Sequence, residues 1–257
     1  FSSGRIGAKT ATRAMAAFAE FGALFRRHGV HEHRAVATSA MRNAANRNEV
    51  LAAIRAECGV SLEAISGDEE AALVRSAVLS RFPSKASPQV IADLGGGSLE
   101  IQVLDGHLRT RGAVLPVGTV RVGEMGTFGS RRAHEIRELV VGELDRQLGP
   151  CPKNVELAAL CGGNAKALAT LVPGKRDHGR RTLNPDELGT SLRWLRKMDV
   201  DQRMRKLQVR RDRAEVIATA AVVFDAVASW LGTPTLVVPG VGVLDGLLHR
   251  AAFDLSC

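Results

Sequence analysis

The 257-residue chain contains no tyrosine and few other aromatic residues, eight Phe and two Trp. Proteins that bind single-stranded nucleic acid stack its bases on aromatic side chains, and this composition offers few such positions. Lys and Arg are most concentrated in RWLRKMDVDQRMRKLQVRRDR (193–213), but no zinc-finger or RNA-recognition pattern accompanies them. The sequence therefore argues against nucleic acid as a partner.

Paired cysteines and long apolar runs are also missing. The four cysteines, Cys58, Cys151, Cys161 and Cys257, include no Cys-x-x-Cys pair, so neither a zinc site nor a disulfide framework is indicated. No uninterrupted apolar run approaches the roughly 18 residues of a membrane span, and no signal peptide is visible at the start. These absences predict a reduced, cytoplasmic protein without a membrane segment.

The balance of charge favours an anionic partner. Apolar residues make up 45% of the chain and charged residues 24%, which is ordinary for a globular protein. Basic residues outnumber acidic ones by 35 to 27, which gives a net charge of +8. Such a charge suits polyphosphate or a nucleotide, although a basic surface without any anionic partner would have the same composition.

Helix and strand patterns alternate in the first third of the chain. Apolar residues at helical spacing predict a helix over 9–28, and HRAVATS (33–39) is typical of a short buried strand. Asn46 with Glu49 three residues later resembles a capping box, which predicts the start of a second helix. A further strand and the helical DEEAALVRSAVL (68–79) follow. This order indicates an α/β domain.

A linker candidate, RFPSKASPQ (81–89), interrupts the pattern with two prolines. After it the strand pattern begins again with VIADL (90–94) and an alternating run over 99–104, and Asp105-Gly106 is a hairpin signal. The sequence thus predicts two α/β domains with a cleft between them, comprising residues 1–84 and 85–257.

Helical patterns dominate the rest of the second domain. Trp194 and Trp230 lie on apolar helix faces, so we expect both in the core. The expected helices cover residues 131–148, 164–172, 185–198 and 212–231. A strand, ELAALCGG (156–163), follows the first of them, and a final strand, TLVVPG (235–240), follows the last, before a short helix.

The most informative motif is a glycine turn between acidic and hydroxyl side chains, formed by Asp93, Gly95, Gly96, Gly97, Ser98 and Glu100. A turn needs one or two glycines, so three in a row suggest a backbone that a ligand approaches closely. Amides in such a turn can form a nest of donors around a phosphate oxygen. Asp93, at a strand end, is placed to hold Mg²⁺, and Ser98 and Glu100 share a strand face. A glycine turn with only a structural role is the alternative.

Other phosphate-binding patterns do not occur. The chain has no G-x-x-x-x-G-K-[ST] sequence, and its glycines do not fit G-x-G-x-x-G. The Asp-x-Gly-Gly-Gly-Ser-x-Glu string instead resembles the second phosphate loop of the actin-like ATPase superfamily. Further segments, in the right order and over nearly the whole chain, are similar to the exopolyphosphatase/guanosine pentaphosphate phosphohydrolase family: ATSAMRNAAN (37–46), ISGDEEA (65–71), LPVGTVRVGE (115–124) and RDRAEVI (211–217).

This resemblance implies two actin-like (ribonuclease H-like) α/β domains and a phosphoanhydride hydrolase. Its substrate would be polyphosphate or guanosine pentaphosphate, with guanosine tetraphosphate as a further ligand, and a homodimer is left open. Glu70 matches the base that activates water, and Asp93 and Glu100 match the acids that organise Mg²⁺. The residues that match phosphate or substrate contacts are Arg42, Gly95, Gly96, Gly97 and Ser98.

The chain departs from the family pattern at three places. It lacks the opening Asp-x-Gly-Ser-Asn-Ser loop, so we expect the first domain without its N-terminal hairpin, an N-terminally incomplete chain and little turnover from it. CGGNAKAL (161–168) lacks two threonines, and Leu244 stands where the family has arginine. A non-catalytic protein that binds polyphosphate or alarmones is therefore an alternative. A sugar-kinase-like phosphotransferase is disfavoured, because the Glu-Glu-Ala and Val-Arg segments match the hydrolases.

Overall fold

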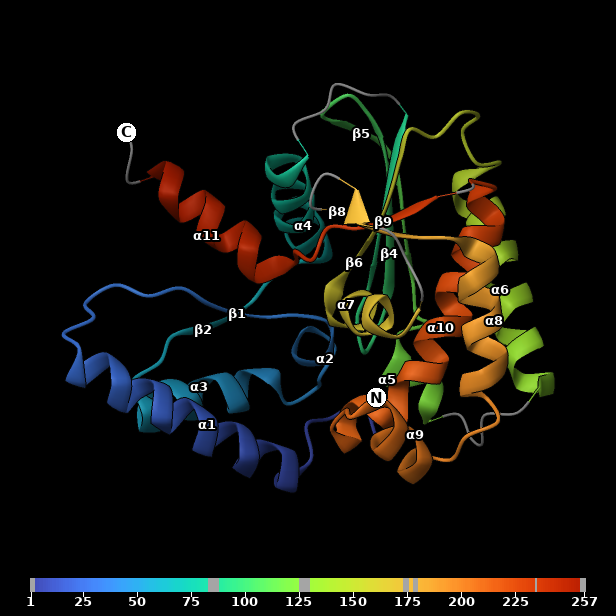
Figure 1. Cartoon of the computed structure of the whole chain (residues 1–257). Coiled ribbons are helices and arrows are strands. Elements are labelled where there is room, and N and C mark those ends of the chain that lie inside the picture. Colours follow the sequence, from blue (N-terminus) through green and yellow to red (C-terminus); the bar gives the residue numbers. More distant parts are fainter. Residues whose placement is uncertain are drawn as a thin grey trace. The chain divides into compact units, whose positions relative to one another are not determined.

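The computed structural model describes residues 3–82, 88–124, 130–172, 176–177, 180–233 and 235–254. The chain forms two compact units, Phe1–Glu70 and Ala71–Cys257, whose elements are labelled in Figure 1.

The first unit packs helices beside a small parallel sheet. Strands β1 and β2 pair in parallel, with Ala35 opposite Leu62. Val50, Ile54 and Cys58 on one face of α3 form the core and pack against apolar residues of α1, as amphipathic helices do. The elements are α1 (Ala8–Arg27), β1 (Ala35–Ala37), α2 (Ser39–Arg42), α3 (Arg47–Cys58), β2 (Leu62–Ala64) and the first turn of α4 (Gly67–Arg81).

The predicted capping box at the start of α3 is wrong. Asn46 is the N-cap residue, but its side chain makes no capping hydrogen bond. Its Oδ1 instead accepts from the Ile6 amide at 2.8 Å, and its Nδ2 donates to the Ile6 carbonyl at 3.0 Å. The side chain thus ties down the segment before α1, a long-range contact that the local pattern did not reveal.

The second unit is built on a seven-stranded sheet of order β5-β4-β3-β6-β9-β8-β7. Strand β4 is antiparallel to β3 and β5, whereas β6 is parallel to β3 and β9. The strands are β3 (Gln89–Leu94), β4 (Leu99–Asp105), β5 (Leu108–Leu115), β6 (Leu157–Cys161), β7 (Arg176–Asp177), β8 (Arg180–Leu183) and β9 (Leu236–Val238).

Helix α10 forms the centre of this unit and packs against α6 and α8 (Figure 1). Among the described helices α10 alone has the length and hydropathy of a membrane span, but 78% of that window is buried in the protein, as in a core helix. Trp230 on α10 is buried as expected, whereas Trp194 on α8 is 43% exposed, so the prediction for Trp194 is wrong. The helices are α5 (Thr119–Gly123), α6 (Ser130–Leu148), α7 (Gly162–Leu171), α8 (Pro185–Leu195), α9 (Val200–Leu207), α10 (Arg211–Leu231) and α11 (Val243–Asp254).

Strand alternation divides the sheet residues between two cores. Even-numbered residues of β3, such as Val90 and Ala92, face the core that contains α6 and α10. Odd-numbered ones, such as Ile91, face Val74 and Val78 of α4. Because side chains alternate along a strand, Asp93 and its cross-strand partner Glu100 lie on the α4 face.

The units divide at Glu70/Ala71, before the expected boundary at 84/85. The physical reason is that Val74, Val78 and Phe82 of α4 pack against the large sheet, so all but the first turn of this helix belongs to the second unit. Most of the predicted linker, residues 83–87, lies outside the described residues.

Helix α11 provides a test of this packing. A Cβ at Gly246 would lie 2.2 Å from the Leu73 carbonyl oxygen of α4, so we expect Gly246→Ala to lower the free energy of unfolding by about 1–3 kcal/mol through overpacking. Gly142 in α6 has open space around it, and Gly142→Ala should raise stability by about 0.5–1 kcal/mol. Urea unfolding of both variants measures the contrast, and equal effects would contradict the close contact.

Candidate active site

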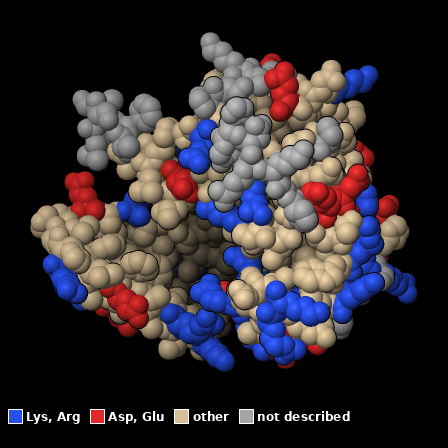
Figure 2. Space-filling model, viewed as in Figure 1, with Lys and Arg blue, Asp and Glu red and all other residues tan. Residues whose placement is uncertain are grey.

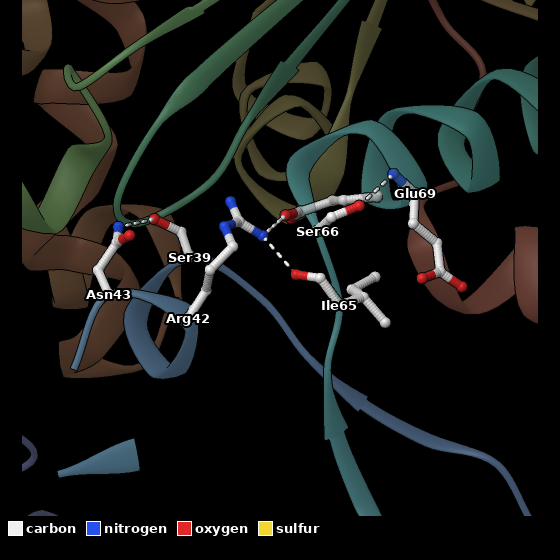
Figure 3. Close-up of polar contacts among 7 residues, drawn as sticks. Ser39, Arg42, Asn43, Ile65, Ser66 and Glu69 are labelled. Carbon is white, nitrogen blue, oxygen red and sulfur yellow. Dashed lines mark hydrogen bonds and ion pairs between the residues drawn. The ribbon is translucent and has the colours of Figure 1, made fainter. Parts of the chain in front are cut away.

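In the first unit, two predicted site residues form an ion pair. Arg42 Nη1 lies 2.8 Å from Glu70 Oε2 and also donates to the Ile65 carbonyl at 3.0 Å. Figure 3 shows the Arg42 side chain reaching from α2 towards Ile65, which lies between β2 and α4. The side chains of Arg42 and Glu70 are only 20% and 11% exposed, so the pair is largely shielded from water.

Ser66 fixes the start of the helix that carries Glu70. Its hydroxyl accepts from the Glu69 amide at 3.1 Å, and its carbonyl accepts from the Glu70 amide at 3.0 Å, which is N-terminal capping. Glu70 Oε2 is held by Arg42, while Oε1 accepts from none of the residues that the structure describes. A carboxylate held by one oxygen can accept a hydrogen bond from water with the other.

In the second unit, the glycine loop joins β3 to β4. The Gly95 amide donates to the Ser98 carbonyl at 3.0 Å. The amides of Gly96, Gly97 and Ser98 donate to no residue in the described part of the chain. None of the three glycines has a positive φ, so turn geometry does not require glycine there. Gly96 is half-buried, and Gly97 and Ser98 are buried. The three glycines have no side chains of their own that could cover the amides, as a phosphate nest requires.

The carbonyl groups of the three glycines accept hydrogen bonds from residues of α5. Gly95 and Gly96 accept from the amides of Thr119 and Val120 at 3.1 and 2.9 Å, and Gly97 accepts from Arg121 Nε at 3.0 Å. The carbonyls are thus engaged on one side of the loop, whereas the amides of Gly96, Gly97 and Ser98 have no acceptor among the described residues.

Gly118 allows this close contact. A Cβ at Gly118 would lie 2.3 Å from backbone atoms of both Gly97 and Ser98, closer than any side chain permits. The LPVGTVRVGE segment therefore supports the loop through its backbone.

Asp93 lies beside the N-terminus of α7. A Cβ at Gly162, where φ is 87°, would be 2.6 Å from Asp93 Oδ1. Burial raises the pKa of the Cys161 thiol, and the negative charge of Asp93 raises this pKa further. A helix N-terminus favours a carboxylate, and glycine at 162 lets the helix approach it.

The carboxylates of Asp93 and Glu100 could take part in binding Mg²⁺. They are direct cross-strand partners, and such partners project from the same face. The described residues contain no cluster of three or more His, Cys, Asp or Glu side chains that could hold a metal. A site with two carboxylates still fits Mg²⁺, which commonly takes one or two carboxylates and completes its shell with water and substrate phosphate.

Two residues that received no role from the sequence lie next to the loop. Asn164 of α7 donates to the Leu94 carbonyl at 3.0 Å, and Arg213 of α10 donates to Asn164 Oδ1 at 2.7 Å. Asn164 lies in CGGNAKAL (161–168), the segment that lacks the two threonines of the family pattern, and Arg213 lies in RDRAEVI (211–217). Their sequence segments were recognised, but only the fold brings them to the end of β3.

Known proteins resemble the chain over nearly its whole length. Exopolyphosphatase 2 of Mycobacterium tuberculosis is 30% identical over 268 residues, which are 96% of this chain and 83% of that protein. Exopolyphosphatase 1 of the same species is 27% identical over 259 residues, or 97% of this chain and 75% of that protein.

Solved structures have the same fold. An exopolyphosphatase from Cytophaga hutchinsonii superposes with a TM-score of 0.85 at 17% identity, covering 98% of this chain and 85% of that one. The Ppx/GppA protein of Aquifex aeolicus gives a TM-score of 0.78 at 23% identity, covering 99% and 85%. The α/β fold implied by the sequence is thus confirmed. Since the model of the Ppx/GppA phosphatase family also matches residues 2–253, the chain belongs to that family.

Proposed function

We propose that the chain releases the terminal phosphate of inorganic polyphosphate by attack of a water molecule. The observation that carries this proposal is the glycine loop, whose three consecutive amides at Gly96, Gly97 and Ser98 are unpartnered within the described structure while its carbonyls are bonded. Neutral amides fixed in one direction bind phosphate oxygens well. Family membership supports phosphoanhydride hydrolysis, and the two mycobacterial relatives are named exopolyphosphatases.

Glu70 is our candidate for the base that activates water. Arg42 holds one of its oxygens at 2.8 Å, so the carboxylate has a fixed direction, and its other oxygen can accept a proton from water. Arg42 was expected to contact substrate; its bond to Glu70 supports a positioning role as well.

Asp93 and Glu100 would hold Mg²⁺ together with the substrate phosphate. The metal would neutralise charge on the phosphate oxygens. The remaining roles would belong to residues of the chain itself. The loop amides would orient the terminal phosphate, and Glu70 would take a proton from water.

Basic residues of α9 and of the first turn of α10 favour a long polyanion over a small nucleotide. Figure 2 shows Lys and Arg side chains gathered over α9, where Arg205 and Lys206 form the last turn. Arg210 and Arg211 follow and are exposed, and Arg213 reaches Asn164 beside the loop. Clustered positive charge attracts a polyanion over several phosphate units.

Gly96→Val tests the loop as a phosphate nest. A Cβ at Gly96 would lie 3.2 Å from Val120 Cγ2, so Val120→Ala is added to the variant to make room. We expect the double variant to fold but to lose at least tenfold in polyphosphate affinity by calorimetry, because the valine covers the amides. Val120→Ala alone is the control and should bind normally. Unchanged binding in the double variant would leave the loop a purely structural turn.

Glu70→Gln tests the base and separates an enzyme from a binding protein. Gln can still accept from Arg42 but cannot take a proton, so phosphate release should fall by roughly 10² to 10⁴-fold while polyphosphate affinity stays similar. The assay uses the protein expressed from its complete reading frame, with Mg²⁺. Glu69→Gln, in the same helical turn and paired with Arg34, is the matched control. Wild-type protein that binds polyphosphate without releasing phosphate would support the non-catalytic alternative.

Asp93→Asn tests the proposed metal ligand. Losing the charge should weaken Mg²⁺ and polyphosphate binding together, because both would meet at this carboxylate. Titrating phosphate release and polyphosphate binding against Mg²⁺ measures the effect. Asp105→Asn, at the exposed far end of β4, is the control. An Mg²⁺ dependence that stays at the wild-type value in Asp93→Asn would remove Asp93 from the metal site.

A further inference from the structure

A cationic pocket, separate from the glycine loop, lies in the C-terminal unit among α6, α8 and α10. Its volume is about 250 Å³. Its apolar floor consists of Ala133, Leu192 and Val222, which are all buried. Its polar lining consists of His134, Arg137, Arg193, Arg196 and Asp225. None of these residues belongs to the glycine loop or its supporting segments.

The sequence directs these side chains to one place. On α8, Gly189, Arg193 and Arg196 are spaced by four and three residues, so they share one face of the helix. On α6, Arg137 lies one turn after Ala133. Because α10 packs against both helices, the two sets of side chains meet over Asp225.

One carboxylate does not balance this positive charge. Arg137 already has two partners within the protein. Its Nη1 lies 3.2 Å from Asp225 Oδ2, and its Nη2 donates to Ser229 Oγ at 2.7 Å. Among the described residues, Arg193 forms a hydrogen bond with the Thr190 hydroxyl alone, at 2.9 Å. The Arg196 guanidinium makes no hydrogen bond or ion pair with a described residue. Three guanidinium groups and one carboxylate leave two positive charges over an apolar floor.

The Asp225 side chain is 19% exposed, so this part of the pocket is partly desolvated. Burial raises the pKa of Asp225, although the neighbouring Arg137 and Arg193 act to lower this pKa. An anion that enters such a pocket would interact with the guanidinium groups at lower effective dielectric than on the open surface.

We propose that this pocket binds a phosphate dianion, either inorganic phosphate or the phosphate group of a small organic ester. The planar guanidinium fork matches two phosphate oxygens, and a dianion would neutralise the two excess charges. Gly189 lines the pocket, and a Cβ there would lie 3.4 Å from Asp225 Oδ1 in van der Waals contact, so a larger side chain at this position would occupy the pocket. The site is independent of the proposed hydrolase chemistry.

The test is calorimetric titration of the Mg²⁺-free protein with inorganic phosphate and with phenyl phosphate. It is performed in the Gly96→Val/Val120→Ala background, so that the glycine loop contributes little. We expect Arg193→Gln/Arg196→Gln to weaken phosphate binding at least tenfold. Arg131→Gln/Arg146→Gln removes two exposed arginines of α6 and should leave binding unchanged.

A second variant separates shape from charge. Gly189→Leu keeps every arginine but fills the pocket, so it should also weaken binding. Tighter binding of phenyl phosphate would identify an organic phosphate that uses the apolar floor, and equal or weaker binding would identify inorganic phosphate. Absence of phosphate binding in the loop-variant background, or equal affinity in Arg193→Gln/Arg196→Gln and its control, would overturn the proposal whether or not the chain hydrolyses polyphosphate.

Discussion

The candidate phosphate site depends on how the backbone of one four-residue loop is bonded. The carbonyls of Gly95, Gly96 and Gly97 accept hydrogen bonds from α5, and this fixes the direction in which the following amides point. A flexible glycine turn would lose entropy on binding phosphate, whereas a loop already bonded on one side is preorganised. The close approach of Gly118 makes that bonding possible, so a residue twenty positions away belongs functionally to the loop.

Helix α4 is fixed to the sheet that carries the loop by a buried glutamine. The Ala71 carbonyl, one residue after Glu70, accepts from Gln102 Nε2 at 3.0 Å, and Arg75 Nη1 donates to Gln102 Oε1 at 2.8 Å. Gln102 is buried on β4, two residues from Glu100 and on the same face of the sheet. A buried amide that is bonded through both its oxygen and its nitrogen fixes the register of helix on strand.

The sequence was sufficient to predict the secondary structure and the candidate loop in segments where the local residue pattern and the chemistry of the side chains point to the same element. Strand alternation and the hairpin signal at Asp105-Gly106 predicted the β3–β4–β5 sheet, and the motif identified the loop. The sequence pattern could not predict long-range contacts. The side-chain carboxamide of Asn46, for example, forms its hydrogen bonds with the backbone of Ile6 and does not cap its own helix. Helix α9 was missed because mostly polar residues cover it, and its Asp199–Gln202 capping box is a short signal in a basic run. Asn164 and Arg213 meet only because α7 and α10 pack together.

The two proposed anion sites use different physical means, and this difference bears on their functions. Backbone amides are neutral, so the glycine loop sets the geometry of a phosphate but needs a cation or basic side chains to offset its charge. Under the proposed function, a cation held by Asp93 and Glu100 would meet that need, because the two carboxylates alone would repel a phosphate. The pocket at Arg193 and Arg196 carries its own positive charge and needs no metal. A site for chemistry benefits from the first arrangement, since a metal can follow charge as it develops; a site for binding alone is served by the second.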